Sequence, residues 1–498
     1  GAAIDAPGPP DAPPASDPAD ASSDQDRGEL AWRLRHARRG ILKDITIPDD
    51  VVADDSLVPA TSPFGASAGR GQTGSSASLS SSLFAGVPLT GQFNLLTTGS
   101  LDSPARLFTP DSFSRSIAYV SLAAPVGEHG DWAVRGALTG GDISAWFAAG
   151  AYTTRAPARH RYDLGASYST QRYDGGNPAA LRQVSEGSRN VGALYGFDTF
   201  ALTPAVSLAY GARVSRYDYL DQGLLLDPRI SLTLAPSDGV RVNAVASRNA
   251  LAPGAEEFLP PVEGGLWLPP QRTFSSIIEG RSLEPEHTSH LAVQVERDIK
   301  ASTVALRVFH QRVDDQLITV FGRDTPSARG AGLGHYLVGN VGDVDATGLS
   351  ASFGGALASR VHGSVEYTLT RARWTRGDDA ADLILLAPSA VRPDSDRIHD
   401  LSTSIATEVP ETSTRVLVFC RMTSARPAAG SERSAYDPRF DVQVHQSLPF
   451  MNFTSARWEM LVAVRNFFRD GSFDSSVFDE LLVTQPPKRI VGGLTVRF

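Results

Sequence analysis

Short segments in which apolar and polar residues alternate follow one another from about Gly91 to the end of the chain. Near the C-terminus, Val462 and Val464 share one parity, while Glu459 and Arg465 share the other. Because successive side chains of a β-strand point to opposite faces, this period of two predicts strands with one apolar and one polar face. The chain holds about 18 such segments. They lie at 91–101, 114–125, 131–140, 143–154, 159–172, 188–200, 203–215, 228–237, 239–249, 287–298, 302–321, 336–355, 359–374, 399–408, 413–424, 436–447, 457–467 and 488–498.

The connections between these segments also follow a pattern, because short turns nearly alternate with longer loops. Residues 127–130 and 236–239 are short turns, whereas 173–187 and 375–398 are long loops. Outer-membrane barrels have this asymmetry, with short turns on the periplasmic side and long loops outside the cell. A β-sandwich or propeller also alternates along each strand, but it needs no such asymmetry.

The last strand supports the same fold. Ile490, Leu494, Val496 and Phe498 lie on one parity, and the chain ends on an aromatic residue. In an outer-membrane barrel the final strand closes the sheet with an outward apolar face, and a terminal Phe serves as the assembly signal. We therefore predict an all-β fold over residues 89–498, a closed antiparallel transmembrane β-barrel of about 18 strands, with a range of about 16–22.

The composition is compatible with this fold and excludes several others. Of the 498 residues 41% are hydrophobic, and the formal net charge is -9. No run approaches the roughly 18 apolar residues of a transmembrane helix. The acidic balance argues against nucleic acid as a partner. Since the chain starts at Gly1 without Met, we expect that a signal peptide has already been removed.

The region before the barrel divides into two parts. Residues 1–26 are rich in Ala, Pro, Asp and Ser, which predicts a disordered tail. In residues 27–88 the sequence predicts a basic amphipathic helix at 29–43, followed by a Ser/Gly-rich connector. One hypothesis is that this region occupies the lumen or its periplasmic mouth; the alternatives are a solvated tether or a docking helix for a periplasmic protein. Its gating candidates are Arg33, Arg35, Arg38 and Arg39.

Strand parity assigns residues to the two faces of the barrel wall. The predicted lumen wall includes Arg135, Asp163, Arg241, Asp441, Glu459 and Arg465. The predicted lipid-facing side chains include Trp132, Leu164, Val442, Val462 and Val464. The extracellular loop 250–286 is unusually apolar, with Phe258 and Trp267 as further gating candidates. This loop folds inward as a constriction, forms a partner surface, or packs on itself.

The sequence contains no convincing catalytic or metal site. Cys420 lies in the middle of a strand, where a small inert residue is expected. His287 and His290 are three residues apart on a strand and therefore point to opposite faces. Asp378 and Asp379 belong to a loop that we interpret as a solvated acidic surface. We predict that the protein is not an enzyme and carries no metal or cofactor.

Four segments resemble the C-terminal barrel of TonB-dependent receptors. Residues 283–296 are similar to that family's L-x-P-E-x-S/T strand start, and the strand at 304–318 and the segment 338–349 follow in the same order and spacing. Residues 228–238 resemble its P-R-x-x-L-x-Y-x-P hairpin, with Leu234 at the Tyr position. The resemblance implies a barrel that is filled by a plug in the larger transporters. Here the residues ahead of the first strand fit no plug and contain no convincing TonB box, so we expect a barrel without a plug.

Two functions remain open. The first is a passive or gated channel that transports small solutes, derived from the receptor barrel. The second is a sealed structural barrel that anchors a surface or periplasmic protein assembly. In both cases the location is the bacterial outer membrane. The expected partners are outer-membrane lipid, the barrel assembly machinery through the C-terminal strand, and a periplasmic or surface protein.

Overall fold

The computed structural model describes residues 90–100, 115–127, 129–140, 143–154, 158–173, 187–254, 272–278, 280–320, 334–377, 395–424, 436–448, 457–466 and 488–497. Within these residues the strands form an 18-stranded sheet and a three-stranded sheet. The strands of the large sheet are β1 (Thr90–Ser100), β2 (Arg115–Val126), β3 (Gly130–Thr139), β4 (Ile143–Thr154), β5 (His160–Tyr173), β6 (Ser188–Thr203), β7 (Val206–Tyr217), β8 (Leu225–Ser237), β9 (Val240–Leu251), β11 (Glu286–Ile299), β12 (Ser302–Asp314), β15 (Gly342–Ala358), β16 (Val361–Arg376), β17 (Ser395–Val409), β18 (Thr414–Ser424), β19 (Tyr436–Ser447), β20 (Arg457–Asn466) and β21 (Lys488–Arg497).

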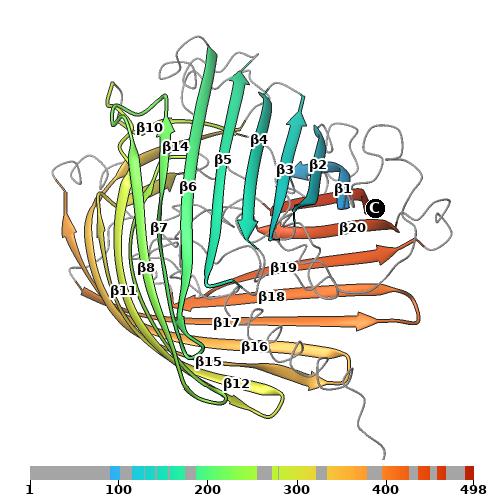
Figure 1. Ribbon diagram of the computed structural model, residues 1–498. Helices are drawn as coiled ribbons and strands as arrows, with labels where there is room; N and C mark the ends of the chain where they lie inside the picture. The colour runs from blue at the N-terminus through green and yellow to red at the C-terminus, as the bar shows by residue number, and fades with distance from the viewer. Residues whose placement is uncertain are drawn as a thin grey trace, which may run out of the picture.

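The large sheet closes on itself. Each strand is antiparallel to its neighbours, and β1 pairs with both β2 and the C-terminal β21. Figure 1 shows the blue β1 between β2 and the red C-terminal strands. Closure leaves the sheet without an unpaired edge, which in a bilayer would expose unsatisfied backbone groups. The predicted fold class, a closed antiparallel barrel of about 18 strands, is confirmed, and each predicted segment overlaps one barrel strand.

The connections confirm the predicted turn pattern. Asp238 and Gly239 alone join β8 to β9, and Lys300 and Ala301 join β11 to β12. Gly239 and Lys300 have φ angles of 74° and 55°, the left-handed conformation that tight hairpins require. At the opposite end, longer connections join β16 to β17 and β20 to β21. Among the described residues, no helix is long and apolar enough to span a membrane.

The two faces of the barrel wall differ in polarity. Large apolar side chains on one parity are exposed, including Leu194 at 64% and Val308 at 56%. The opposite parity is shielded and often polar, as at Gln294 and Ser350. Since a closed barrel shields its concave face, the polar parity faces inward and the apolar parity faces outward. This is the reverse of a water-soluble sheet protein and matches a wall that contacts lipid.

Two predicted strands are interrupted, and here the sequence-based prediction was wrong. The segment predicted at 302–321 forms β12 and then β13 (Leu317–Val320), and the segment at 336–355 forms β14 (Gly334–Asn340) and then β15. The breaks occur where Asp315 and Gly342 adopt positive φ angles of 57° and 128°. Backbone hydrogen bonds from Gln316 N to Gly342 O (2.7 Å) and from Val341 N to Gln316 O (2.9 Å) hold the two breaks together.

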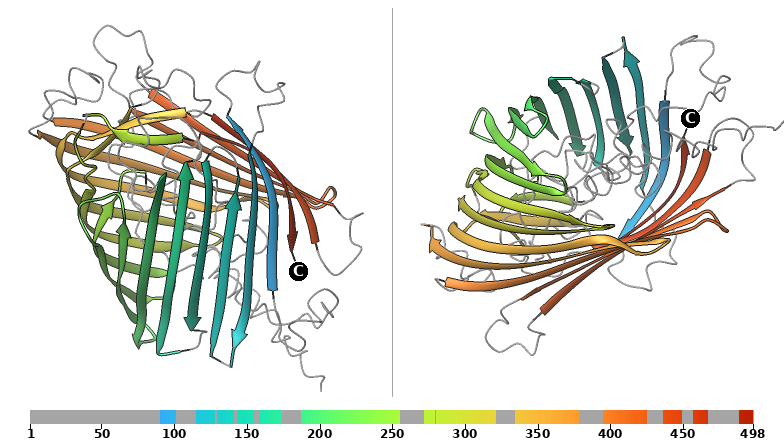
Figure 2. Two further views of the ribbon diagram at one scale, coloured as in Figure 1. Left: turned by 90° about the horizontal axis from the view of Figure 1, so that it is seen from above. Right: turned by 60° about the horizontal axis from the view of Figure 1, so that its bottom comes forward.

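The separated ends form the three-stranded sheet with β10 (Arg272–Ser276), a strand inside the predicted loop 250–286. The strand order is β10-β14-β13, with β10 parallel and β13 antiparallel to β14. In Figure 2, left, these short strands run across the wall strands at the rim. This rim is the end of the barrel with the longer loops. We call this element the mouth sheet.

Candidate functional site: the barrel lumen and its mouth

Charged side chains on the inner face pair between strands that are adjacent or one strand apart. Arg307 Nη2 of β12 lies 3.2 Å from Glu366 Oε1 of β16 and 3.2 Å from the Ser350 hydroxyl of β15 between them. Ser350 in turn shares a 2.6 Å hydrogen bond with Thr368. Each member of this network is buried. Because a buried ion pair is stable only with further hydrogen bonds, the two hydroxyl groups are part of the reason this pair is tolerated.

Similar pairs continue around the wall. Arg421 Nε lies 2.7 Å from Asp400 Oδ2, which also accepts a 2.7 Å hydrogen bond from the Thr423 hydroxyl. Arg415 Nη2 lies 3.4 Å from Glu459 Oε1. These pairs join β17 to β18 and β18 to β20, so fixed charges of both signs line the inner surface.

The predicted lumen-wall residues occupy this inner face where the structure describes them. Arg241 forms ion pairs with Glu296 (3.6 Å) and Asp298 (2.7 Å), and Glu459 contacts Arg415 as described above. Arg135, Asp163 and Asp441 lie half-buried on the inward parity of β3, β5 and β19. For Arg465 the backbone pairs with Arg489, and its side chain lies outside the described part of the chain.

The predicted lipid-facing residues lie on the outward parity. Leu164, Val462 and Val464 are exposed, while Trp132 and Val442 are half-buried. Contact of these side chains with lipid stays a prediction. The gating candidates Arg33, Arg35, Arg38, Arg39, Phe258 and Trp267, the tail 1–26, the region 27–88 and Phe498 all lie outside the described residues.

The mouth sheet fills space inside the barrel rather than extending the wall. One of its faces contributes Phe274, Leu317 and Val338 to an apolar cluster with inward residues of β6 to β9, such as Val191 and Tyr217. Loop 250–286 therefore does fold inward over the part that the structure describes. Of the three alternatives for this loop, residues 272–278 and 280–286 follow the one in which the loop folds inward.

The other face of the mouth sheet packs against a different part of the wall. Ile318 and Val341 join a second cluster with inward residues of β12 to β17, including Phe309, Val344 and Trp374. In β13 the adjacent Leu317 and Ile318 thus point to different clusters, and in β14 Val338 and Leu337 do the same, as the period of two requires. The sheet is wedged between the β6–β9 wall and the β12–β17 wall at the long-loop end.

A buried arginine ties the mouth sheet to the wall. Arg189, at the start of β6, is fully buried, and its guanidinium carbon lies 3.8 Å from the Phe274 ring centroid and 5.1 Å from that of Tyr219. Its Nη2 donates a 2.9 Å hydrogen bond to the Phe274 carbonyl oxygen. The role of Arg189 was not predicted from the sequence, because nothing in the alternation of β6 distinguishes an inward arginine that meets water from one that meets an aromatic ring.

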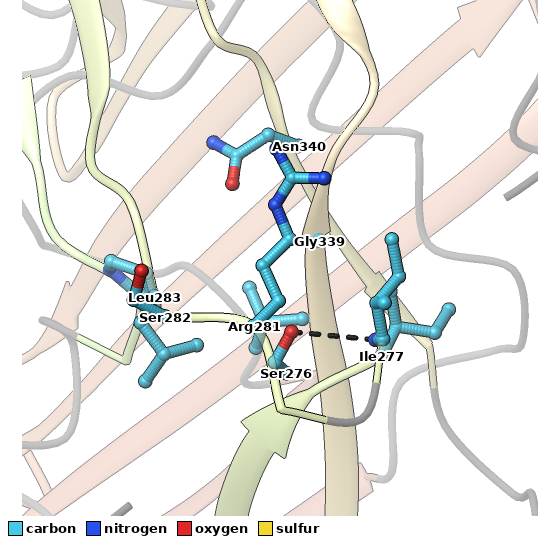
Figure 3. A pocket seen from close by; sticks show the side chains of 10 residues that line it. Ser276, Ile277, Arg281, Ser282, Leu283, Gly339 and Asn340 are labelled. Atoms are coloured by element: carbon cyan, nitrogen blue, oxygen red, sulfur yellow. Dashed lines mark hydrogen bonds between the residues drawn. The ribbon is translucent and has the colours of Figure 1, made fainter. Parts of the chain in front are cut away.

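A small pocket opens beside the mouth sheet (Figure 3). Its lining combines Arg281, Asn340 and Ser276 with the apolar Ile277 and Leu283. The Arg281 side chain extends toward Asn340 in this view, and Ser276 Oγ accepts a hydrogen bond from the backbone N of Ile278 (3.3 Å). The pocket places one basic and several neutral polar groups beside the mouth sheet, at the long-loop end of the barrel.

A closed barrel with an apolar outer face and a charged inner face belongs to the class of outer-membrane transport and receptor barrels. A sequence model of the family described as "TonB dependent receptor-like, beta-barrel" matches residues 8–407. The chain therefore belongs to the TonB-dependent receptor-like β-barrel family, whose members are receptors and transporters of the outer membrane. No curated protein sequence matches it.

Some solved structures are similar to this chain at low sequence identity. The siderophore receptor PirA from Pseudomonas aeruginosa is 13% identical, with 82% of this chain and 80% of that chain covered and a TM-score of 0.36. The FrpB iron transporter from Neisseria meningitidis is 12% identical, with coverage of 77% and 64% and a TM-score of 0.39. These values describe a distant likeness and identify no cargo for this chain.

Proposed function

We propose that this outer-membrane barrel transports small polar solutes through its lumen, and that the mouth sheet constricts the extracellular end. The observation that carries the proposal is the charged inner wall. Its best-defined ion pairs are Arg307–Glu366 and Arg421–Asp400. Ionised groups away from water are costly unless they are paired and hydrogen-bonded. A wall lined with such groups favours a lumen that holds water or a polar solute.

The two apolar clusters that contain mouth-sheet residues have a different distribution from several of the charged pairs. The wall members Val344, Trp374 and Ile398 lie toward the long-loop end of their strands, as do Val191 and Tyr217. Arg241, Glu296 and Glu459 lie toward the short-turn end. This supports a constriction at the mouth above a polar lower lumen. The region 27–88, for which the sequence predicts a basic helix, is proposed to narrow the periplasmic side.

The packed mouth also favours a second candidate, the sealed structural barrel that anchors a protein assembly. A mouth sheet buried on both faces is what a permanent seal requires. The two functions differ in whether ions cross the barrel, and both assign its outer face to lipid and β21 to recognition by the barrel assembly machinery.

Single-channel conductance in a planar bilayer tests the proposal. The intact chain is compared with a deletion of residues 1–88 and with Phe274→Ala, which weakens the mouth sheet. Steady current from the intact chain supports transport, and current only after the deletion identifies the N-terminal region as a seal. Silence from all three proteins refutes transport and leaves the structural function. The control is Leu194→Ala, which changes an exposed outward side chain and should leave conductance unaltered.

A further inference from the structure

Four neighbouring strands carry outward side chains that change from apolar to basic toward the long-loop end. The pairing of β12, β15, β16 and β17 aligns these side chains in rows across the barrel. From the apolar band toward the rim, the rows are Val308-Leu349-Leu369-His399, then His310-Thr347-Arg371-Arg397, then Arg312-Asp345-Arg373-Ser395. The outer wall therefore passes from apolar to charged within two rows.

Three arginines in these rows form a basic patch, which we define as Arg371, Arg373 and Arg397. Arg371 and Arg397 lie directly opposite each other on β16 and β17, and Arg373 follows two residues along the same face. All three side chains are exposed. In contrast to Arg312, whose Nε lies 2.8 Å from Asp314 Oδ1, their guanidinium groups make no hydrogen bond or ion pair within the described residues.

The absence of a partner for these three arginines within the described residues has an energetic meaning. Side chains directly opposite in an antiparallel pair have Cβ atoms about 4.5–5.5 Å apart, and like charges at this spacing destabilise the sheet. Asp345 is opposite Arg373, and the Asp345 carboxylate also lies 3.7 Å from His310 Nε2. No acid in the register lies opposite Arg371 or Arg397. An external anion between these two guanidinium groups would relieve the repulsion.

The side chains below the patch show where it lies relative to the membrane. Tyr367 OH and His399 Nδ1 form a 2.7 Å hydrogen bond on the outer face, and Leu369 and Leu401 flank them. Aromatic residues mark the boundary between acyl chains and headgroups in outer-membrane barrels. The basic patch begins where this apolar band ends, on the long-loop side, so it faces the headgroups of the outer leaflet.

We propose that this surface binds a phosphorylated glycolipid of the outer leaflet. Arg371 and Arg397 would hold one phosphate between them, because the planar guanidinium group donates two hydrogen bonds to a phosphate. Arg373 is placed to contact a second anionic group, and the acyl chains would lie on Leu349 and Leu369. An amphiphile with phosphate and acyl chains fits a basic patch directly above an apolar band. An acidic soluble protein matches only the basic part.

The experiment titrates the full-length protein in detergent with diphosphorylated lipid A, followed by native mass spectrometry. Parallel titrations use dephosphorylated lipid A and phosphatidylglycerol. The double variant Arg371→Gln/Arg397→Gln is compared with Arg297→Gln/Arg360→Gln, which removes two exposed arginines at the short-turn end of the same wall. Heat-modifiable gel mobility checks that each variant is folded.

We expect the patch variant to bind diphosphorylated lipid A at least about tenfold more weakly than wild type, since a hydrogen bond to a charged group accounts for about that factor. The control variant should bind diphosphorylated lipid A within about twofold of wild type. The affinity of Arg371→Lys/Arg397→Lys should lie between those of wild type and the glutamine variant, because lysine keeps the charge but cannot donate two parallel hydrogen bonds. Equal binding by the two glutamine variants overturns the proposal. So does equally tight binding of dephosphorylated lipid A or phosphatidylglycerol, or an acidic protein retained by the patch in place of glycolipid.

Discussion

Replacement of Arg189 by Met should release the mouth sheet while leaving the barrel intact. The guanidinium group is fully buried over Phe274 and donates to its carbonyl oxygen at 2.9 Å. A desolvated cation–π contact contributes about 2 kcal/mol, and a hydrogen bond from a charged group about 1.5–3 kcal/mol. Relief of the buried charge offsets part of this sum. We therefore expect a net loss of about 2 kcal/mol, equivalent to about a 30-fold larger open population of the mouth sheet.

Hydrogen–deuterium exchange measures this local opening. Peptides covering 272–278 and 317–320 should exchange up to about 30-fold faster in Arg189→Met, because local opening exposes their amides without global unfolding. The amide of Ile277, which donates to Val338 O at 2.8 Å, is a direct reporter. Barrel strands should keep their protection, since the wall is hydrogen-bonded independently of the mouth sheet.

The matched control is Arg216→Met, an exposed outward arginine on β7. Exchange in both peptides should be the same in this variant as in the wild type. Unchanged exchange in Arg189→Met would show that packing alone holds the mouth sheet. Loss of protection throughout the barrel would show that Arg189 belongs to the folding core of the wall, and either result refutes the assignment of this residue as the anchor.

Three further predictions concern the wall and the mouth. If Val462 lies at the bilayer midplane, Val462→Arg should destabilise the barrel by about 2–4 kcal/mol, measured by urea-dependent folding into bilayers. Leu357→Arg, near a short turn, should cost only about 0–1 kcal/mol. Equal costs for the two variants would contradict the outward register. Glu366→Gln leaves Arg307 without its carboxylate, so the reversal potential of any conducting barrel should shift toward anions, and an unshifted potential would place this pair off the conduction path. Burial and the nearby Asp343 raise the pKa of Asp315, in the turn outside the spanning strands, above its usual value. The closed mouth sheet is therefore stabilised as the pH falls through this pKa and loses that stabilisation as the pH rises. Amide exchange of residues 317–320 should be faster at neutral pH than at acid pH, after correction for intrinsic rates. Asp315→Asn should abolish the difference, because asparagine tolerates the positive φ angle but does not titrate.

The barrel was predictable from sequence because its strands obey a local rule. Each wall strand must present apolar groups to lipid and polar groups to the lumen, so the period of two is visible in every segment. Loop lengths then fix which ends lie together. Val462 and Glu459 were assigned to opposite faces from parity alone, and the structure has them on opposite faces.

The mouth sheet was not predictable because its strands are defined by tertiary contacts and not by a local sequence pattern. Leu317 and Ile318 continue the apolar character of β12, and only the positive φ of Asp315 separates them from it. An aspartate at position 315 does not by itself predict a break, because Asp314, directly before it, still lies within β12. Phe274 was hidden for a related reason: an apolar loop segment has no period that distinguishes a buried strand from a self-packed loop.

The inner wall carries charged groups toward the short-turn end and apolar clusters around the mouth sheet, and this difference bears on how a solute would cross. Fixed charges such as Arg241 and Glu459 lie toward the short-turn end, where under the proposed function a polar solute would exchange water for protein groups. The two apolar clusters that hold the mouth sheet lie toward the long-loop end, and under the proposed function they would have to be displaced before a solute passes. The mouth sheet continues the chain from β12 and β15 at one side and contacts the rest of the wall mainly through side-chain packing, whereas the wall strands are joined by continuous backbone pairing. Opening the mouth therefore requires no broken barrel strand. A barrel that only anchors an assembly would need the seal but not the charged wall beneath it, and this is why the transport function is the stronger of the two.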